Sequence, residues 1–173
     1  MDRATSTTIV VVIILLALAG MVLGWRARRR RQSAIGRPDA VPADPGATVV
    51  SVEAFYAATT LANEPLNRVA VRGLGFRGRA TITVTTTGVI LGIAGTPEIY
   101  VPSGALRAVE RATFTIDRVV ESGGLVVIAW TVPGSSPTDV DSFFRVTDPA
   151  ELTPLIDAIA GLVPAETTPG KAS

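Results

Sequence analysis

Few side chains in this 173-residue sequence are suited to chemistry. The sequence has no His and no Cys, so it lacks the commonest catalytic base, the commonest metal ligand and any thiol. The nearest approach to a reactive pair is Asp139 and Asp141, which are two residues apart and would share one face of a strand. A solvated strand edge beside a loop rich in Ser and Pro is the favoured interpretation of these two acids. The sequence therefore predicts no enzyme activity, no cofactor and no metal site.

A basic cluster follows the most apolar stretch of the chain. The cluster consists of Arg26, Arg28, Arg29, Arg30 and Arg31. It directly follows Thr7–Trp25, nineteen residues without an ionisable side chain, which as a helix would be about 28 Å long, close to the ~30 Å hydrocarbon core of a bilayer. We interpret residues 7–25 as a transmembrane helix flanked by these arginines.

The position of the arginines also predicts the orientation of the helix. Arginines beside a span stay in the cytoplasm, so we expect the N-terminus outside and the C-terminal domain at the cytoplasmic face of the cell membrane. A cleaved signal peptide is disfavoured because its positive charge would precede the apolar run. Within the span, Gly20 and Gly24 form a G-x-x-x-G pair that would allow a helix–helix contact. The frequent use of Gly in membrane helices is the favoured explanation of that pair.

A third group of residues forms a candidate binding strip, namely Arg72, Phe76, Arg77 and Arg79. Ordinary solvated arginines are the favoured alternative. Residues 53–163 carry eight arginines against eleven acids, a net charge of −3, which argues against nucleic-acid binding and against adhesion to anionic lipids through net charge.

Four segments must position these residues. Residues 1–31 form the anchor, and residues 32–52, with Pro38, Pro42 and Pro45, form a Pro-rich linker. Residues 53–163 form one domain and residues 164–173 a disordered tail. We expect Val52–Tyr56 to open the domain as a turn or a short helix that packs both Phe55 and Tyr56.

The domain itself reads as β-rich with one closing helix. Alternating or continuous apolar runs bounded by turn residues predict strands at Arg68–Arg72, Arg79–Thr85, Val89–Ile93, Glu98–Val101, Leu125–Val132 and Val140–Val146. The apolar positions of residues 106–116 change phase, which predicts either a bulge or a short helical turn followed by a strand. In the clearest strand, Ala80, Ile82 and Val84 should face the core. We expect Asp148 to cap an amphipathic helix that ends before Pro164. Alternatively, the helix begins again with Thr153 as its cap and Pro154 as its first residue.

Several runs resemble a family of bacterial single-pass membrane proteins with a pleckstrin-homology-like (PH-like) domain. They are Leu74–Gly78, Ile99–Pro102, Gly123–Trp130 and Phe143–Arg145, and the similarity extends over Tyr56–Leu162 and the order of anchor and arginines. The resemblance implies a mainly-β PH-like barrel of about seven antiparallel strands capped by a C-terminal α-helix. Members are loosely labelled as membrane or export proteins, and some are encoded among pyrimidine-biosynthesis genes. Residues 115–120 depart from the family pattern.

The leading hypothesis for function is a non-enzymatic, membrane-anchored PH-like protein. It would serve as a protein-interaction or scaffolding module at the cytoplasmic face, with an unknown protein partner or a second copy of itself. The alternative is recognition of a lipid or small ligand by the barrel. An accessory role in transport or export is the weaker alternative, because one span offers no polar pathway.

Overall fold

The computed structural model describes residues 3–33, 35–69, 73–112, 114–115, 118–119 and 125–164. The chain forms two compact units, residues 1–34 and residues 35–173. Every residue of the hydrophobic core cluster lies in the second unit, which therefore has a complete core of its own. The two units are described separately.

The first unit is a single helix, α1 (Arg3–Ser33). Its large apolar side chains are exposed on all sides wherever they are described, in residues 9–24. The helical part of the prediction for residues 7–25 is confirmed. No helix among the described residues is both long enough and apolar enough to qualify as a membrane-crossing segment, so the transmembrane part of that prediction is not confirmed.

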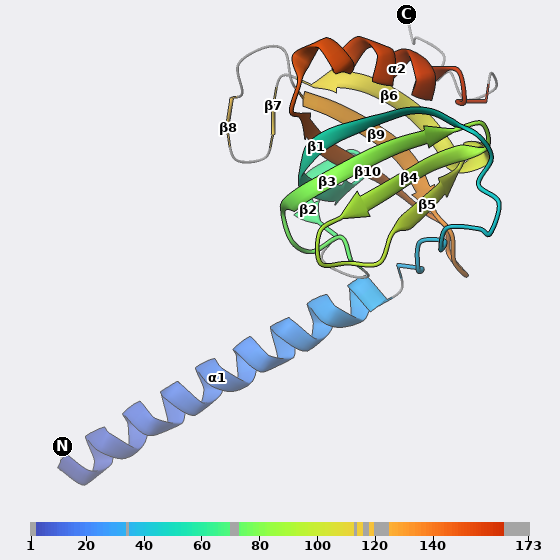
Figure 1. The fold of residues 1–173 in the computed structure, drawn as a ribbon. Coiled ribbons are helices and arrows are strands. Elements are labelled where there is room, and N and C mark those ends of the chain that lie inside the picture. Colours follow the sequence, from blue (N-terminus) through green and yellow to red (C-terminus); the bar gives the residue numbers. More distant parts are fainter. Residues whose placement is uncertain are drawn as a thin grey trace, which may run out of the picture. The chain divides into compact units, whose positions relative to one another are not determined.

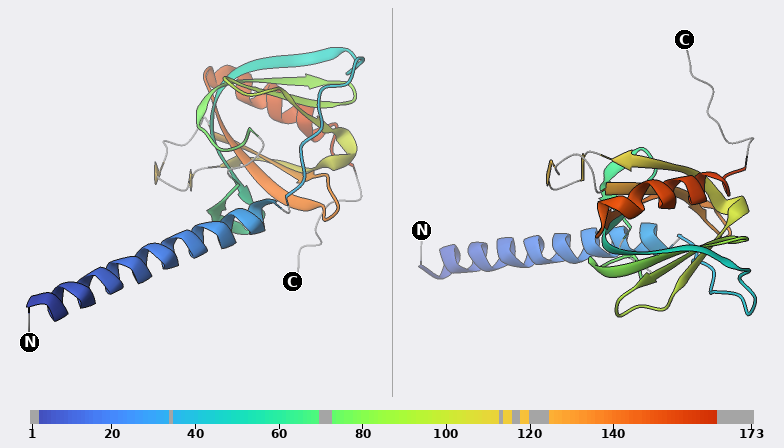
Figure 2. Two further views of the ribbon diagram at one scale, coloured as in Figure 1. Left: turned by 90° about the horizontal axis from the view of Figure 1, so that it is seen from below. Right: turned by 45° about the horizontal axis from the view of Figure 1, so that its top comes forward.

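The second unit is a bent antiparallel sheet with a C-terminal helix (Figures 1 and 2). Its strands run in the order β5-β4-β3-β1-β10-β9-β6, and β2 pairs with β1 outside this path. The bounds are β1 (Thr48–Leu61), β2 (Glu64–Arg68), β3 (Gly78–Thr85), β4 (Gly88–Ile93), β5 (Ile99–Pro102), β6 (Leu106–Ala112), β9 (Leu125–Val132) and β10 (Thr138–Val146). A separate small hairpin joins β7 (Phe114–Thr115) to β8 (Arg118–Val119).

The predicted mainly-β fold is confirmed, but the sheet is not a closed barrel. Among the described residues, β5 and β6 are the two ends of the ladder and do not pair with each other. The chain passes between them through η1 (Ser103–Ala105), and the outer edge of β5 pairs elsewhere: the Tyr100 N–H donates to the Asp39 carbonyl oxygen at 2.9 Å. Pro102 has no N–H with which to continue a ladder.

The strand patterns predicted most of the sheet correctly. Ala80, Ile82 and Val84 of β3 are buried as expected, because alternate residues of a strand face opposite sides. The bulge predicted in residues 106–116 lies between Leu106 and Ala108. The turn or short helix predicted at Val52–Tyr56 is wrong.

That segment is the middle of the longest strand, β1, which begins at Thr48, inside the range predicted as linker. In β1, Val52, Ala54 and Tyr56 are buried at alternate positions, whereas Phe55 points outward. The packing of Phe55 into the core is therefore also wrong. Of the predicted strand Arg68–Arg72, only Arg68 lies in β2, and residues 70–72 are outside the described residues.

Residues 35–47, which we name the N-terminal strap, pack against the sheet although their sequence predicted a linker. Ile35 joins the core cluster. A Cβ at Gly36 would overlap the carbonyl oxygen of Pro133 and lie 2.9 Å from the Gly134 Cα. At the other end, the Pro45 carbonyl accepts a hydrogen bond from the Thr87 hydroxyl at 2.6 Å.

One helix, α2 (Leu152–Ala160), covers an opening of the bent sheet and packs against β1, β3 and β6 (Figure 2). The Asp148 carboxylate accepts from the Ala150 N–H at 2.9 Å and caps the 3₁₀ turn η2 (Pro149–Glu151) that leads into it. Pro154 lies in the first turn of α2, where its missing N–H costs nothing. The predicted cap at Asp148 is confirmed. The predicted tail beyond Pro164 is outside the described residues.

Candidate functional site: an outward row of arginine and phenylalanine

Three exposed side chains form a row across the outer face of the sheet. Phe55 of β1 pairs in register with Arg79 of β3 on one side and with Arg145 of β10 on the other. Paired side chains on one face of a sheet have Cβ atoms about 5 Å apart, so each arginine flanks the phenylalanine. We name these three residues the Arg–Phe–Arg row.

The row faces outward because its neighbours face the core. Tyr56 and Phe144, which follow and precede two members of the row in the chain, are completely buried and stack at a centroid distance of 5.3 Å. Since side chains alternate along a strand, Phe55 and Arg145 must lie on the opposite face. Phe55 is 43% exposed, unusually open for a large apolar side chain in the middle of a central strand.

A hydrogen-bond network fixes the buried side of these strands. The Tyr56 hydroxyl donates to the Thr59 hydroxyl at 2.8 Å and to the Leu74 carbonyl at 2.9 Å, as alternative donor contacts. Ser142 contacts Thr59 at 2.7 Å and accepts from the Trp130 indole N–H at 2.9 Å. No side-chain polar atom described as buried lacks a partner. The network sets the register of β1 against β10 and thereby positions the row.

Two residues of the predicted strip adjoin the row. Phe76 and Arg77 directly precede β3 and are both exposed, Phe76 by 84%. Arg79 is itself part of the row and pairs with Phe55, whereas Phe76 and Arg77 are its near neighbours in the chain. Arg72, the fourth predicted residue, lies outside the described residues.

The opposite end of β10 is acidic. Asp139 forms an ion pair with Arg107 at 3.4 Å and accepts from the Thr131 hydroxyl at 2.7 Å. Partial burial raises the pKa of Asp141, and the charge of Arg107 offsets part of that rise. Within the described ranges, no group of three or more His, Cys, Asp or Glu side chains is arranged to hold a metal ion. These acids behave as part of a charged strand end.

The remaining predicted residues lie in α1. A Cβ at Gly20 or Gly24 would meet no atom within 4 Å, so the surface around both glycines is open. Arg26 is exposed. The side chains of Arg28, Arg29, Arg30 and Arg31 are outside the described part of the structure.

Sequence reasoning missed Phe55 and Arg145 as members of a site. They are ninety residues apart in the chain, and β1 was not recognised as a strand. The alternation Val52, Ala54, Tyr56 was the available signal, since it places Phe55 on the other face. The pairing with Arg145 depends on a β-bulge between Tyr56 and Ala58, which no local pattern reveals.

Comparison with known proteins shows the family of the chain. The family described as bacterial PH domain-like matches residues 35–160, a range that includes the strap, the sheet and α2. The chain belongs to this family. Its PH-like domain is the kind of fold that serves as a protein or lipid interaction module. No curated protein matches the chain.

Proposed function

We propose that this protein is a membrane-anchored module whose PH-like domain binds a protein partner at the cytoplasmic face through the Arg–Phe–Arg row. The observation that carries the proposal is the exposed Phe55 held between two arginines on a rigid sheet. Aromatic residues and arginine are the side chains most enriched at the energetic centres of protein interfaces. The partner would present a carboxylate-rich surface around an apolar patch.

Charge distribution supports a protein partner over a lipid surface. The domain carries a net charge of −3 over residues 53–163, so its field as a whole repels an anionic leaflet. A protein partner needs complementarity only over the contact area.

The anchor in this proposal is α1. Its support is the uninterrupted run of uncharged residues from Thr7 to Trp25, followed by five arginines, together with apolar side chains exposed around the helix. A helix that is apolar on all sides requires an apolar environment. The proposed lack of enzymatic activity is supported by a sequence without His or Cys.

The test uses a photo-crosslinking amino acid in the full-length chain, expressed in its own cells. Placed at Phe55, p-benzoylphenylalanine should give at least one discrete protein adduct on illumination. The same residue at Ser135, in an exposed loop, is the positional control. When Arg79→Glu and Arg145→Glu are added to the chain with the crosslinker at position 55, the yield of the adduct should fall by roughly tenfold or more. The two substitutions reverse the charges that flank the crosslinker and would contact the partner.

The charge-matched control is Arg111→Glu, which changes an exposed arginine of β6 outside the row and should leave the adduct unchanged. If the crosslinker forms adducts with lipid alone, the ligand of the row is a lipid and not a protein. An adduct that forms equally from Ser135, or that survives both reversals, would remove the row as the binding surface. An adduct with a second copy of the chain would identify self-association as the interaction.

A further inference from the structure

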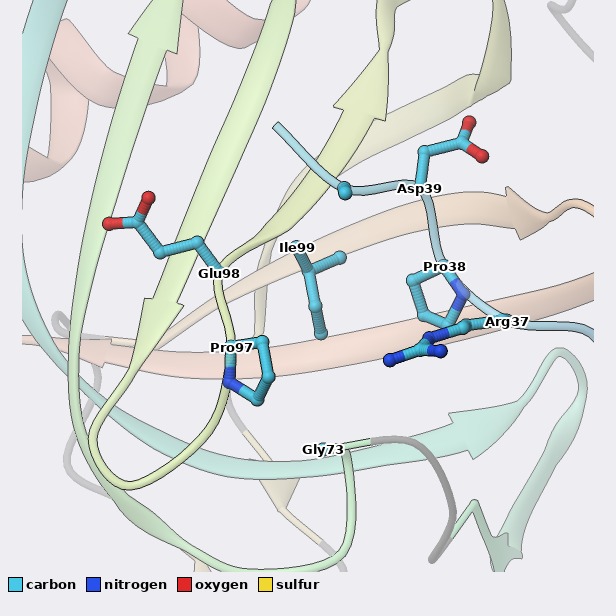
Figure 3. Close-up of a pocket in the computed structure, with 8 residues that line it drawn as sticks. Arg37, Pro38, Asp39, Gly73, Pro97, Glu98 and Ile99 are labelled. Atoms are coloured by element: carbon cyan, nitrogen blue, oxygen red, sulfur yellow. The ribbon is translucent and has the colours of Figure 1, made fainter. Parts of the chain in front are cut away.

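A cavity of about 850 Å³ lies between the N-terminal strap and the start of β5 (Figure 3). Its volume is within the ~300–1,000 Å³ range of small-molecule sites. It is distinct from the Arg–Phe–Arg row, none of whose residues lines it. Pro38, Pro97 and Ile99 supply apolar lining, and Gly73 lines it without a side chain.

One charged group points into this cavity. In Figure 3 the Arg37 side chain reaches across toward Pro97, whereas the carboxylates of Asp39 and Glu98 point away in opposite directions. Arg37 is exposed, and among the described side chains no carboxylate pairs with its guanidinium. The guanidinium is therefore available to a ligand.

The backbone around Arg37 is held in place from both sides. Gly36 packs directly on Pro133 and Gly134, and Pro38 is buried. One residue further, the Asp39 carbonyl accepts from the Tyr100 N–H at 2.9 Å. The arginine thus projects from a fixed piece of chain, so binding would cost little backbone ordering.

The lining indicates which ligand would fit the cavity. A guanidinium binds a carboxylate through two parallel hydrogen bonds, and the prolines and Ile99 favour an apolar body. Asp39 and Glu98 add two negative charges to the surroundings against the single positive charge of Arg37. The attraction to Arg37 and the repulsion by the two acids both grow with ligand charge. Because the acids outnumber the arginine, a monoanion is favoured over a dianion such as a phosphate monoester.

We infer that this cavity is a binding site for a small amphiphilic carboxylate, with its head group on Arg37 and its apolar body against Pro38, Pro97 and Ile99. This site is independent of the proposed protein interface. It would let the domain respond to a metabolite while the row contacts a partner.

The experiment is an NMR titration of the ¹⁵N-labelled fragment of residues 35–173, which contains the whole core cluster. The probe is 4-phenylbutyrate. Acetate supplies the head group alone, and 4-phenylbutanol supplies the body alone. We expect saturable shifts of the Ala40, Gly73 and Ile99 amides with 4-phenylbutyrate, and affinity about tenfold or more lower for the other two compounds, because each lacks one of the two contacts.

Two variants tie the binding to the arginine. Arg37→Gln should lower the affinity for 4-phenylbutyrate about tenfold or more. Arg37→Lys should retain part of the affinity because it keeps the positive charge. Arg111→Gln changes an exposed arginine of β6 that belongs neither to the row nor to the lining of the cavity, and it should bind as the unmodified domain does. The inference is overturned if 4-phenylbutyrate gives no saturable shifts, if the shifts map away from the cavity, or if Arg37→Gln binds with unchanged affinity.

Discussion

At the scale of single residues, Tyr56 has the most demanding environment in the domain. Its ring is fully buried, and its hydroxyl lies within hydrogen-bond distance of Thr59 and of the Leu74 carbonyl. Burial raises the pKa of Tyr56 from 10.0 to about 12, and the Thr59 hydrogen bond and the charge of Arg68 offset part of that rise. The folded state therefore requires the neutral phenol.

This pKa predicts a loss of stability at alkaline pH. Below pH 10 the phenol is neutral in both states; as pH rises from 10 to about 12 it ionises first in the unfolded chain, so the free energy of unfolding falls. The fall due to this residue is about 2–3 kcal/mol. Tyr56→Phe should remove it, while lowering stability at pH 7 by about 1–3 kcal/mol because a buried carbonyl loses its partner.

Urea denaturation of both proteins from pH 7 to pH 12 measures the effect as a difference in the free energy of unfolding, in which ionisations common to both proteins cancel. The two stabilities should converge above pH 10. If the free energies of unfolding of the two proteins fall in parallel as the pH rises, the buried phenol does not control alkaline unfolding.

At the scale of elements, the N-terminal strap extends the sheet without being a strand. Its contacts run from Ile35 in the core to Pro45 beside Thr87, and between them the Asp39 carbonyl pairs with Tyr100 on the outer edge of β5. A bare strand edge exposes backbone donors and acceptors to other chains. The strap covers that edge at Tyr100.

The close approach at Gly36 makes the strap sensitive to one methyl group. Gly36→Ala would place a Cβ into the Pro133 carbonyl, and we expect a loss of about 1–3 kcal/mol in the free energy of unfolding, as for other overpacked sites. The matched control is Gly104→Ala, where a Cβ meets nothing within 4 Å. Equal stability of the two variants in thermal and urea denaturation would show that the strap contributes nothing.

The sequence predicts those elements whose pattern lies within one short stretch of the chain, and it misses those that depend on contacts between distant residues. β3 and α2 were predicted because alternate residues such as Ala80 and Ile82, or a cap such as Asp148, lie close together in the chain. The strap was missed because its prolines look like those of a linker, and only distant residues such as Pro133 hold it. The row was missed for the same reason, since its three members come from three strands. Arg79 alone was predicted as part of a site.

At the scale of the whole molecule, the chain combines an apolar helix with an independent acidic domain. The core of the β unit contains no residue of α1. Each unit can therefore be altered without changing the interior of the other. The proposed topology depends only on α1, which contains both the apolar run and the arginines after that run.

This arrangement predicts the location of the C-terminus. A reporter that is active on only one side of the membrane, fused after Ser173, should give a cytoplasmic signal. Replacing Arg26 and Arg28–Arg31 by Gln should reduce that signal and increase the external one, because the positive charges set the orientation. Replacing the same number of arginines in the β unit is the control. An external signal from the unmodified chain would contradict the proposed orientation. Recovery of the fusion protein in the soluble fraction would contradict the proposed membrane anchor.

The strap also determines how the domain would respond to mechanical load. Tension transmitted along the chain from α1 enters the β unit at Ile35 and reaches Gly36, Arg37 and Asp39 before any strand. Among the described residues, an isolated backbone bond joins this stretch to β5, between Asp39 and Tyr100. β1 is held by continuous ladders instead, with β3 over Thr48–Tyr56 and with β10 over Ala54–Leu61. Peeling would therefore begin at the strap, and the cavity wall that carries Arg37 would be lost while the sheet stayed intact.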